Sequence, residues 1–329
     1  MKSILITGCS GFIGYHLTRK IHEIYKDHII VGVDNMNDYY DVSIKEKRLD
    51  EILKLDRFIF HKINISNNNE LKNIFEKYDI EYVINLAAQV GVRYSVENPK
   101  VYIESNIIGF YNILENCRRY NVNNLIYASS SSVYGEYNWT PKSEDNIENN
   151  PASLYGATKI CNEVLAASYS NMYKIKTTGL RFFTVYGPNG RPDMAYWKFV
   201  ERALNDRYIE IYGDEQGDGQ LTRDFTYVDD IVDGIIKSLN YWTPYGKYHR
   251  VINLGTNNSI TLNDFVKTIE EILGFSIPKV YKEKPLGDAK STYADIDKAW
   301  RELRWEPKTD LKTGLTRFIE WYKENIKIN

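Results

Sequence analysis

The sequence predicts an α/β protein built on a doubly wound parallel sheet, with a smaller mixed α/β substrate domain at its C-terminal end. Short apolar segments alternate with segments of helical periodicity over the first half of the chain. The apolar segments are nearly continuous, which indicates strands covered on both faces. A glycine-rich turn directly after the first apolar segment supports the same fold class.

The apolar segments and the helical segments give the expected elements. The expected strands are Ser3–Thr7, Ile29–Asp34, Phe58–Lys62, Tyr82–Asn85, Leu125–Ser129, Thr177–Phe182 and Val251–Leu254. The expected helices are Phe12–Ile24, Glu70–Tyr78, Pro99–Tyr120, Ser153–Tyr173 and Ile231–Leu239. The asparagine-rich stretches Asn67–Asn69 and Asn146–Asn150 are expected to be loops.

The regular alternation ends after Tyr186, where prolines begin to separate shorter elements. We therefore expect a first domain over residues 1–185 and a second, substrate-binding domain over residues 186–329. Apolar helix and strand patterns return near the middle of the second half, so we expect about residues 225–255 to join the first domain.

Composition excludes several classes of function. The 329-residue chain has a net charge of −2 and no basic block, so we expect no nucleic-acid partner. No uncharged apolar run reaches the ~18 residues of a membrane span, and the first strand starts too early for a signal peptide. Three scattered cysteines, Cys9, Cys117 and Cys161, predict reduced thiols in a cytoplasmic protein and no metal site.

The glycine-rich turn is the expected cofactor site. Gly8, Gly11 and Gly14 follow a strand and open a helix, where backbone can approach a pyrophosphate. Asp34 ends the second strand, and a carboxylate there accepts hydrogen bonds from ribose hydroxyls while repelling the 2′-phosphate of NADP. These residues predict a Rossmann-type domain that binds NAD; the alternative is a strand–helix corner with an incidental aspartate.

Tyr155 and Lys159 are the expected catalytic pair. Residues four apart share one face of a helix, and a nearby ammonium favours phenolate over phenol. A free tyrosine titrates near ~10, so lowering its pKa makes it a better base toward an alcohol. Because the chain has 27 tyrosines, a chance spacing with a solvated lysine is the alternative.

Six motifs together resemble the extended short-chain dehydrogenase/reductase family, specifically its NAD-dependent nucleotide-sugar epimerases and dehydratases. They are TGxxGxxG at Thr7–Gly14, LAAQVGVRYS at Leu86–Ser95, YASSSSVYG at Tyr127–Gly135, YGATK at Tyr155–Lys159, RFFTVYGP at Arg181–Pro188 and RDFTYVDDIV at Arg223–Val232. Two narrower stretches, residues 34–49 and 181–195, resemble UDP-glucuronate 4-epimerases. The resemblance covers essentially the whole chain.

The resemblance implies a role for each matching residue. Tyr155 would take the proton of the sugar 4-hydroxyl while NAD+ takes the C4 hydride. Lys159 would lower the tyrosine pKa and bind the nicotinamide ribose, so that Tyr155 and Lys159 both belong to the NAD site. Ser130 would relay the proton, with Ser131 or Ser132 sharing the task. Further NAD contacts would come from Phe12, Ile13, Asn35, Asn64, Ile65, Leu86, Ala87, Ala88 and Asn106. Substrate contacts would come from Arg93, Ser131, Thr184, Arg191, Arg223 and Asp288, with Arg191 and Thr184 on a sugar carboxylate.

The serine run favours epimerisation over elimination. Dehydratases of this kind carry Asp-Glu at the positions of Ser131 and Ser132, and decarboxylases usually carry glutamate in place of Ser132. The expected reaction is interconversion of UDP-glucuronate and UDP-galacturonate. The alternatives are 4-epimerisation of a neutral or N-acetylated UDP-hexose, decarboxylation of UDP-glucuronate, and a catalytically idle NAD-binding scaffold.

The resemblance also implies a homodimer, in which Pro99–Tyr120 and the Tyr155 helix pair with their copies. The apolar residues that would meet there, or would instead form monomer core, are Ile103, Ile107, Phe110, Tyr111 and Leu114.

Overall fold

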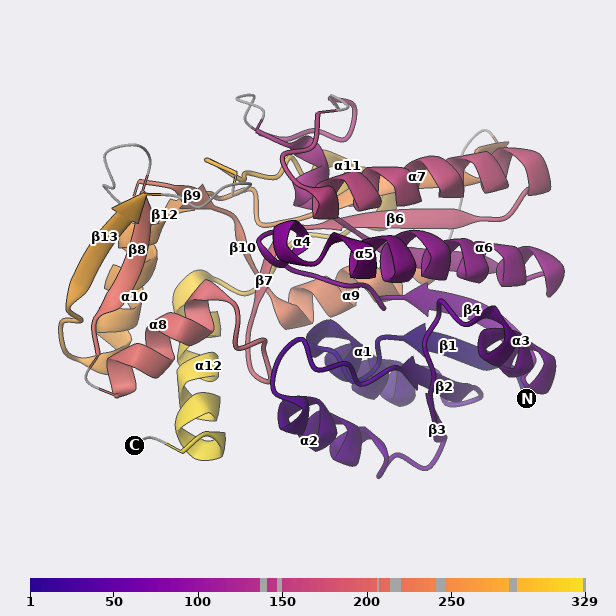
Figure 1. Cartoon of the computed structure of the whole chain (residues 1–329), viewed down its shortest axis with the longest axis horizontal. Coiled ribbons are helices and arrows are strands. Elements are labelled where there is room, and N and C mark those ends of the chain that lie inside the picture. The colour runs from indigo at the N-terminus through magenta and orange to yellow at the C-terminus, as the bar shows by residue number, and fades with distance from the viewer. Residues whose placement is uncertain are drawn as a thin grey trace.

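A parallel sheet of seven strands forms the centre of the protein, seen in a computed structural model that describes residues 1–136, 141–146, 150–205, 207–213, 220–240, 246–283 and 289–327 (Figure 1). The strand order is β11-β6-β5-β4-β1-β2-β3, and every neighbouring pair is parallel. The strands are β1 (Ser3–Thr7), β2 (Ile29–Asp34), β3 (Phe58–Lys62), β4 (Ile80–Asn85), β5 (Asn124–Ser130), β6 (Thr177–Phe182) and β11 (His249–Leu254). The predicted doubly wound α/β fold is confirmed.

Helices cover both faces of this sheet, as Figure 1 shows. One face packs against α1 (Phe12–Ile24), α2 (Val42–Ile52) and α9 (Val228–Leu239). The other face packs against α3 (Asn68–Lys77), α6 (Gly109–Arg119) and α7 (Leu154–Tyr173).

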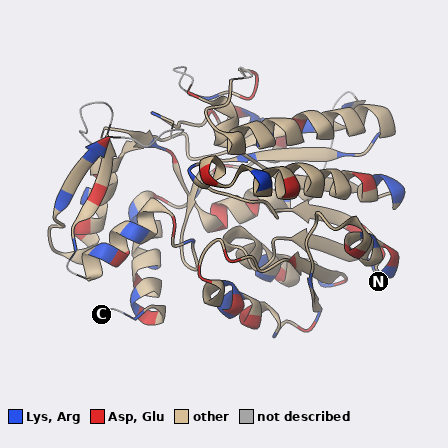
Figure 2. Ribbon diagram, viewed as in Figure 1, with Lys and Arg blue, Asp and Glu red and all other residues tan. Residues whose placement is uncertain are grey.

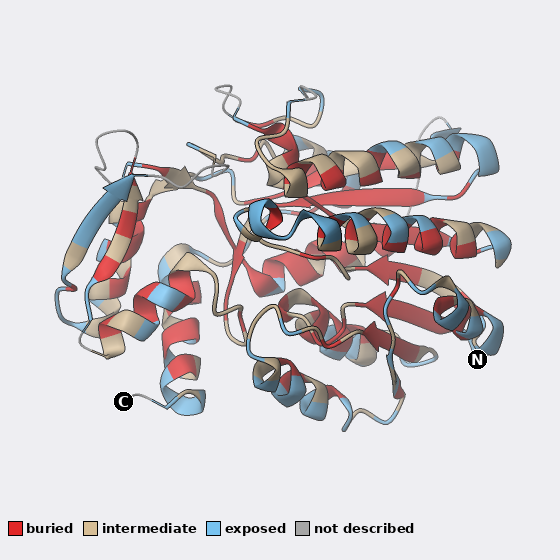
Figure 3. Ribbon diagram, in the orientation of Figure 1, coloured by how far each residue is buried: buried red, intermediate tan, exposed pale blue. Residues whose placement is uncertain are grey.

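The alternation of side chains along β1 explains why the strands read as continuous apolar runs. Ile4 and Ile6 pack into the core on the α1 side, whereas Leu5 packs into the core on the α6 side. All three are fully buried, since successive side chains of a strand point to opposite faces and both faces are covered. Figure 3 shows the same burial along the other central strands.

Three of these helices, α2, α3 and α7, have a side-chain cap at the N-terminus. Ser153 caps α7 by accepting a hydrogen bond from the Gly156 N–H at 3.1 Å, and Asp41 caps α2 in the same way. The expected loop at Asn67–Asn69 was wrong: Asn67 caps α3, and the two following asparagines form its first turn. The sequence reading did not identify α2.

The helix expected over Pro99–Tyr120 is found, but it is not α-helical throughout. The structure has α5 (Pro99–Tyr102), a π-helical segment η1 (Ile103–Ile108) and then α6. The carbonyl of Asn106, within η1, accepts a hydrogen bond from Asn162 Nδ2 at 2.6 Å. That long-range bond engages a carbonyl that would otherwise serve the helix, at the point where the helical register changes.

Most of the remaining elements form smaller sheets and helices at the carboxyl edge of the large sheet, whereas α11 (Asp297–Leu303) packs against β11 and α9. The strand pairs are β7 (Thr184–Tyr186) with β10 (Phe225–Tyr227), β8 (Ile209–Gly213) with β13 (Lys279–Glu283), and β9 (Thr222–Arg223) with β12 (Ile260–Thr261). The other helices are α4 (Tyr94–Glu97), the 3-10 turn η2 (Ser131–Tyr134), α8 (Ala195–Leu204), α10 (Leu262–Leu273) and α12 (Leu311–Asn325).

The outer helices carry charges of both signs (Figure 2), and the cysteines form no disulfide. Acidic and basic residues are interleaved along the outer helices (Figure 2). Among the described residues, no helix combines the length and the apolar character needed to cross a bilayer. Cys9 and Cys117 are buried and Cys161 is half-buried, and all three are unpaired.

Candidate active site

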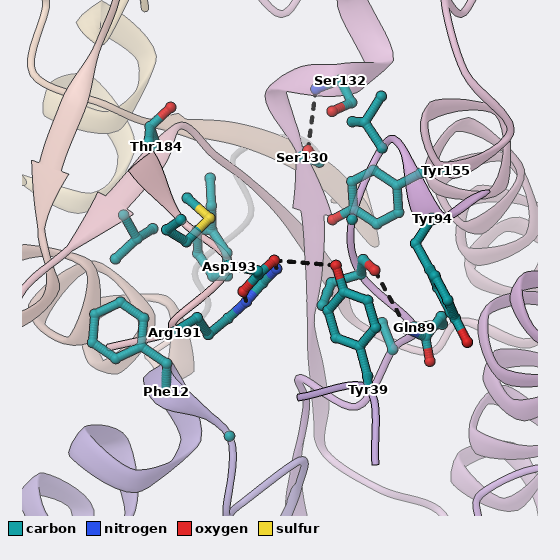
Figure 4. A pocket seen from close by; sticks show the side chains of 18 of the residues that line it. Phe12, Tyr39, Gln89, Tyr94, Ser130, Ser132, Tyr155, Thr184, Arg191 and Asp193 are labelled. Carbon is teal, nitrogen blue, oxygen red and sulfur yellow. Dashed lines mark hydrogen bonds and ion pairs between the residues drawn. The ribbon is translucent and has the colours of Figure 1, made fainter. Parts of the chain in front are cut away.

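A cavity of about 910 Å³ opens at the carboxyl ends of β1, β2, β4 and β5, facing the smaller C-terminal sheets. Ligands of doubly wound sheets bind in the crevice where the strand order reverses, here beside β1 and β4. Figure 4 shows side chains from distant parts of the chain pointing into this space. The predicted site residues that line it are Gly8, Gly11, Phe12, Ile13, Gly14, Asp34, Asn35, Asn64, Ile65, Leu86, Ala87, Ala88, Arg93, Ser130, Ser131, Ser132, Tyr155, Lys159, Thr184, Arg191 and Arg223.

The glycine turn between β1 and α1 has no room for side chains. A Cβ on Gly14 would lie 2.0 Å from the Gly8 carbonyl oxygen, and a Cβ on Gly8 would lie 2.8 Å from the Ala87 nitrogen. Gly8 also has a φ of +72°, which favours glycine. No side chain caps α1 and its first turn holds no acidic residue, so its N–H groups remain suited to an anion.

Asp34 lies at the end of β2 on the wall of the same cavity. Its two carboxylate oxygens accept hydrogen bonds from Ser10 N at 3.1 Å and from Met36 N at 2.9 Å. These bonds fix the carboxylate and leave each oxygen with further acceptor capacity. A fixed negative charge at this place suits ribose hydroxyls and opposes a phosphate.

Two predicted site residues are not found on the cavity wall. Asn106 is buried behind it, where its amide accepts from Gln89 N at 2.8 Å and donates to Thr158 Oγ1 at 3.1 Å. It therefore holds the loop after β4 against α7. Asp288 lies outside the described residues.

Tyr155 lies in the first turn of α7, with its hydroxyl directed into the cavity beside Ser130 (Figure 4). Burial raises the pKa of Tyr155, while a hydrogen bond with Ser130 and the charge of Arg191 act in the opposite direction. Ser130 ends β5 and its hydroxyl also accepts from Ser132 N at 3.1 Å. Ser131 and Ser132 follow in η2 and line the same wall.

Lys159 is buried one turn after Tyr155. Its Nζ donates to the Ala128 carbonyl at 2.8 Å and lies 5.8 Å from the centre of the Tyr155 ring. Burial lowers the pKa of Lys159 to about 8, opposed by the charge of Glu163. In this structure, burial of the Tyr155 phenol outweighs the influences that lower its pKa.

Arg191 lies across the cavity from Tyr155 (Figure 4). Its Nε donates to Asp193 Oδ1 at 3.0 Å, and its Nη2 donates to Asp193 Oδ2. The Tyr39 hydroxyl donates to the same carboxylate at 3.1 Å. Arg191, which with Thr184 forms the expected carboxylate clamp for the sugar, therefore lies in the cavity. Its guanidinium is already paired with Asp193.

The other predicted substrate residues come from three separate elements. Thr184 opens β7, and its backbone N–H donates to the Asp224 carbonyl at 3.0 Å. The Arg93 guanidinium lies 4.8 Å from the ring centre of Tyr212 on β8. Arg223 on β9 donates to the carbonyls of Thr222 and Lys290. Together they line the half of the cavity that faces the smaller sheets.

Sequence reasoning missed Tyr39 and Asp193, which also line the cavity. Both lie inside the two stretches noted for their narrower resemblance, residues 34–49 and 181–195. The sequence shows only that each stretch contains polar residues. The fold is needed to show that Tyr39 and Asp193 are in contact.

Known proteins resemble this chain along its whole length. "Protein CapI" of Staphylococcus aureus is 47% identical over 98% of this chain and 99% of its own. A UDP-glucuronate 4-epimerase of Thermodesulfobacterium geofontis is 42% identical over 100% of this chain and 98% of its own.

Two solved structures show the same fold. The UDP-glucuronic acid 4-epimerase of Bacillus cereus, solved with UDP-glucuronic acid and NAD, has a TM-score of 0.90 and 35% identity over 98% of this chain and 99% of that chain. The UDP-glucose 4-epimerase of Thermotoga maritima, solved with UDP-glucose, has a TM-score of 0.88 and 32% identity over 99% and 100%.

The NAD dependent epimerase/dehydratase family model matches residues 4–255, the part of the chain that holds the glycine turn, the serine run and the Tyr155–Lys159 pair. With full-length relatives and this cavity, the match shows that the chain belongs to that family.

Proposed function

We propose that this protein interconverts UDP-glucuronate and UDP-galacturonate by NAD-dependent epimerisation at C4. The observation that carries the proposal is the Arg191 guanidinium, which shares one cavity with the Tyr155 hydroxyl and the glycine turn. A base, a nucleotide site and a cation for a carboxylate are the groups that this substrate needs. The named relatives and the Bacillus cereus structure support the same substrate.

The glycine turn and Asp34 fit NAD. The backbone of Gly11 and Gly14 and the N-terminus of α1 would hold the pyrophosphate, since no side chain there competes for the space. Asp34 would accept hydrogen bonds from ribose hydroxyls, and its charge favours NAD over NADP. Bound NAD+ supplies the chemistry of accepting a hydride from C4 and returning it.

Tyr155 is the proposed base. It would take the proton of the 4-hydroxyl and later return it, with Ser130 and its neighbours Ser131 and Ser132 relaying the proton. The charge of Arg191 and the Ser130 hydrogen bond both favour the phenolate. Lys159 would fix the depth of α7 against β5 through its bond to the Ala128 carbonyl.

Arg191 and Thr184 would hold the sugar carboxylate. A guanidinium binds a carboxylate through paired hydrogen bonds, which fix its plane as well as its position. The plane matters because the 4-keto form of the sugar is a β-keto acid that tends to lose CO2. Ser132 offers a hydroxyl where decarboxylases usually have glutamate, which further favours epimerisation.

A panel of UDP-sugars tests the proposal. The purified protein, without added reductant, should convert UDP-glucuronate to UDP-galacturonate as followed by NMR. Faster turnover of UDP-galactose or UDP-N-acetylgalactosamine than of UDP-galacturonate would contradict the carboxylate assignment. A UDP-pentose as the main product would instead identify a decarboxylase.

We also propose the domain division 1–185, joined by about 225–255, for NAD and 186–329 for the UDP-sugar. Placement of α9 on the large sheet and of β11 within it supports that division. The unpaired cysteines support a cytoplasmic location.

A homodimer through η1, α6 and α7 is our proposal for the assembly. Ile103, Ile108, Tyr111 and Val164 are exposed apolar residues on these elements. Phe110 and Leu114, which the sequence offered for the same contact, are instead buried in the monomer core, and Ile107 is half-buried. Sedimentation of the wild type and of Val164→Glu should give a dimer and a monomer, respectively; a monomeric wild type contradicts the proposal.

A further inference from the structure

Two stretches far apart in the sequence, residues 34–49 and 181–195, meet beside the cavity. The Tyr39 hydroxyl donates to Asp193 Oδ2 at 3.1 Å, and Arg48 Nη2 donates to the Gly190 carbonyl at 2.6 Å. The first stretch begins at Asp34, on the cofactor side of the cavity. Through Tyr39 and Arg48 it also contacts the loop that carries Arg191. Residues 34–49 therefore touch the proposed carboxylate clamp as well as the nucleotide side of the cavity.

Asp193 occupies one edge of the Arg191 guanidinium. It binds Nε and Nη2, which is the side edge of the planar group. The remaining nitrogen, Nη1, belongs to the opposite end of the fork. An arginine held in this way can offer Nη1 to a second carboxylate in a fixed plane, while Asp193 keeps the group from swinging.

Tyr39 is itself held in place. Its ring lies 4.9 Å from the ring of Tyr94, and its hydroxyl occupies space that no side chain at position 91 could share, because a Cβ on Gly91 would lie 2.2 Å from it. Burial of Asp193 opposes its ionisation, but Arg191 and the Tyr39 hydrogen bond hold the pKa of Asp193 below its usual value. The carboxylate is thus charged and fixed.

Arg48 fixes the backbone of the loop that carries Arg191 by a hydrogen bond to the Gly190 carbonyl. This side chain is almost fully buried and donates to Ser10 O at 3.2 Å, to the Tyr40 hydroxyl at 2.7 Å and to Gly190 O. Ser10 belongs to the glycine turn, so one guanidinium joins the cofactor loop to the clamp loop. The Arg191 N–H also donates to the Tyr196 hydroxyl at 3.2 Å.

We propose that Tyr39 and Asp193 are positioning residues for Arg191, and that through them residues 34–49 keep the sugar carboxylate in the plane that prevents its loss. The inference rests on the proposed function. In the 4-keto acid, the C5–C6 bond breaks when it aligns with the carbonyl π system; its electron pair forms the C4–C5 enolate, which takes a proton at C5 as CO2 leaves. A loosened Arg191 permits that alignment.

The test compares Tyr39→Phe and Asp193→Asn with wild type on UDP-glucuronate. Asp38→Asn is the matched control, because it removes the same charge from an exposed neighbour in the Tyr39 stretch. NMR measures UDP-galacturonate and the 4-keto-pentose, and absorbance of the reduced nicotinamide follows the hydride that is not returned. We expect a kcat lower by on the order of tenfold to a hundredfold and a correspondingly larger decarboxylated share, with KM changed less.

The product ratio separates positioning from folding. A variant that only folds poorly gives less product at the wild-type ratio, and that result in both variants would overturn the inference. The inference is also overturned if Asp38→Asn changes the ratio of decarboxylated product to UDP-galacturonate as much as Asp193→Asn does. Failure of the wild type to convert UDP-glucuronate at all would instead overturn the proposed function.

Discussion

Tyr155 lies in surroundings that oppose its ionisation. Burial raises the pKa of its phenol, and only the Ser130 hydrogen bond and the Arg191 charge act against that effect. The Ser130 hydrogen bond therefore supports the phenolate form that the proposed base requires. Lys159, the cation that the sequence assigned to this role, donates its hydrogen bond to a backbone carbonyl.

Replacing Tyr155 with phenylalanine should remove turnover and leave binding intact. The change deletes the hydroxyl and little volume, and loss of a general base costs on the order of 10²–10⁴ in rate. Steady-state rates with UDP-glucuronate and calorimetric binding of UDP check both parts. A variant with near wild-type kcat would show that Tyr155 is not the base.

Asp34 should determine the nucleotide that the protein carries. Its carboxylate is fixed by Ser10 N and Met36 N and faces the cavity, so a 2′-phosphate would meet a negative charge. Denaturing the purified protein should release NAD, identified by chromatography, and Asp34→Ala should retain less of it. Stoichiometric NADP in the supernatant would refute this assignment.

At the scale of elements, α7 and β5 carry the catalytic geometry together. Lys159 bonds the Ala128 carbonyl, and Glu163, one turn further on, accepts from Ser129 Oγ at 2.5 Å. Glu163 also pairs with the fully buried Arg181 of β6 at 2.8 Å. These contacts fix the rotation and depth of α7, and so the place of Tyr155.

The alkaline limit of activity should report Lys159. Burial lowers its pKa to about 8, so its proton is lost as the pH rises through that value and kcat/KM should fall above about pH 8. Glu163 raises the same pKa, so Glu163→Gln should move the limit to lower pH. A wild-type profile that stays flat to pH 10, or an unmoved limit in the variant, would exclude this role.

The sequence predicted some elements better than others for physical reasons. Strands such as Ser3–Thr7 were found to the residue because burial on both faces leaves a continuous apolar run. The π segment within Pro99–Tyr120 was not, because the Asn106–Asn162 bond that accompanies it is not a local signal. Tyr39 and Asp193 escaped notice since 154 residues separate them.

At the scale of the whole molecule, helices on one face of the large sheet bond the loop after β7, which lines the cavity. His16 on α1 bonds the Pro188 carbonyl at 2.8 Å through Nε2, and Arg48 on α2 bonds Gly190. Both side chains come from helices that carry or support the cofactor site. The clamp loop is thereby tied to the nucleotide side of the protein.

His16 should make stability depend on pH. Burial lowers its pKa to about 4 in the folded protein, against ~6.5 unfolded, so the folded state binds fewer protons between these values. The contribution of His16 to the free energy of unfolding is complete above about pH 6.5. It decreases as the pH falls toward 4, by roughly 3 kcal/mol at most. The urea midpoint of unfolding should change more between pH 5 and pH 7 for the wild type than for His16→Gln. An equal change in the two proteins would contradict this role of His16.

The most direct test of the central claim follows the hydrogen at C4. UDP-glucuronate labelled with deuterium at C4 is incubated in ordinary water with the wild-type protein, and the UDP-galacturonate formed is examined by NMR and mass spectrometry. Oxidation and re-reduction at C4 by one bound NAD predicts full retention of deuterium at C4. Replacement of that deuterium by solvent hydrogen, or no UDP-galacturonate at all, would contradict the account.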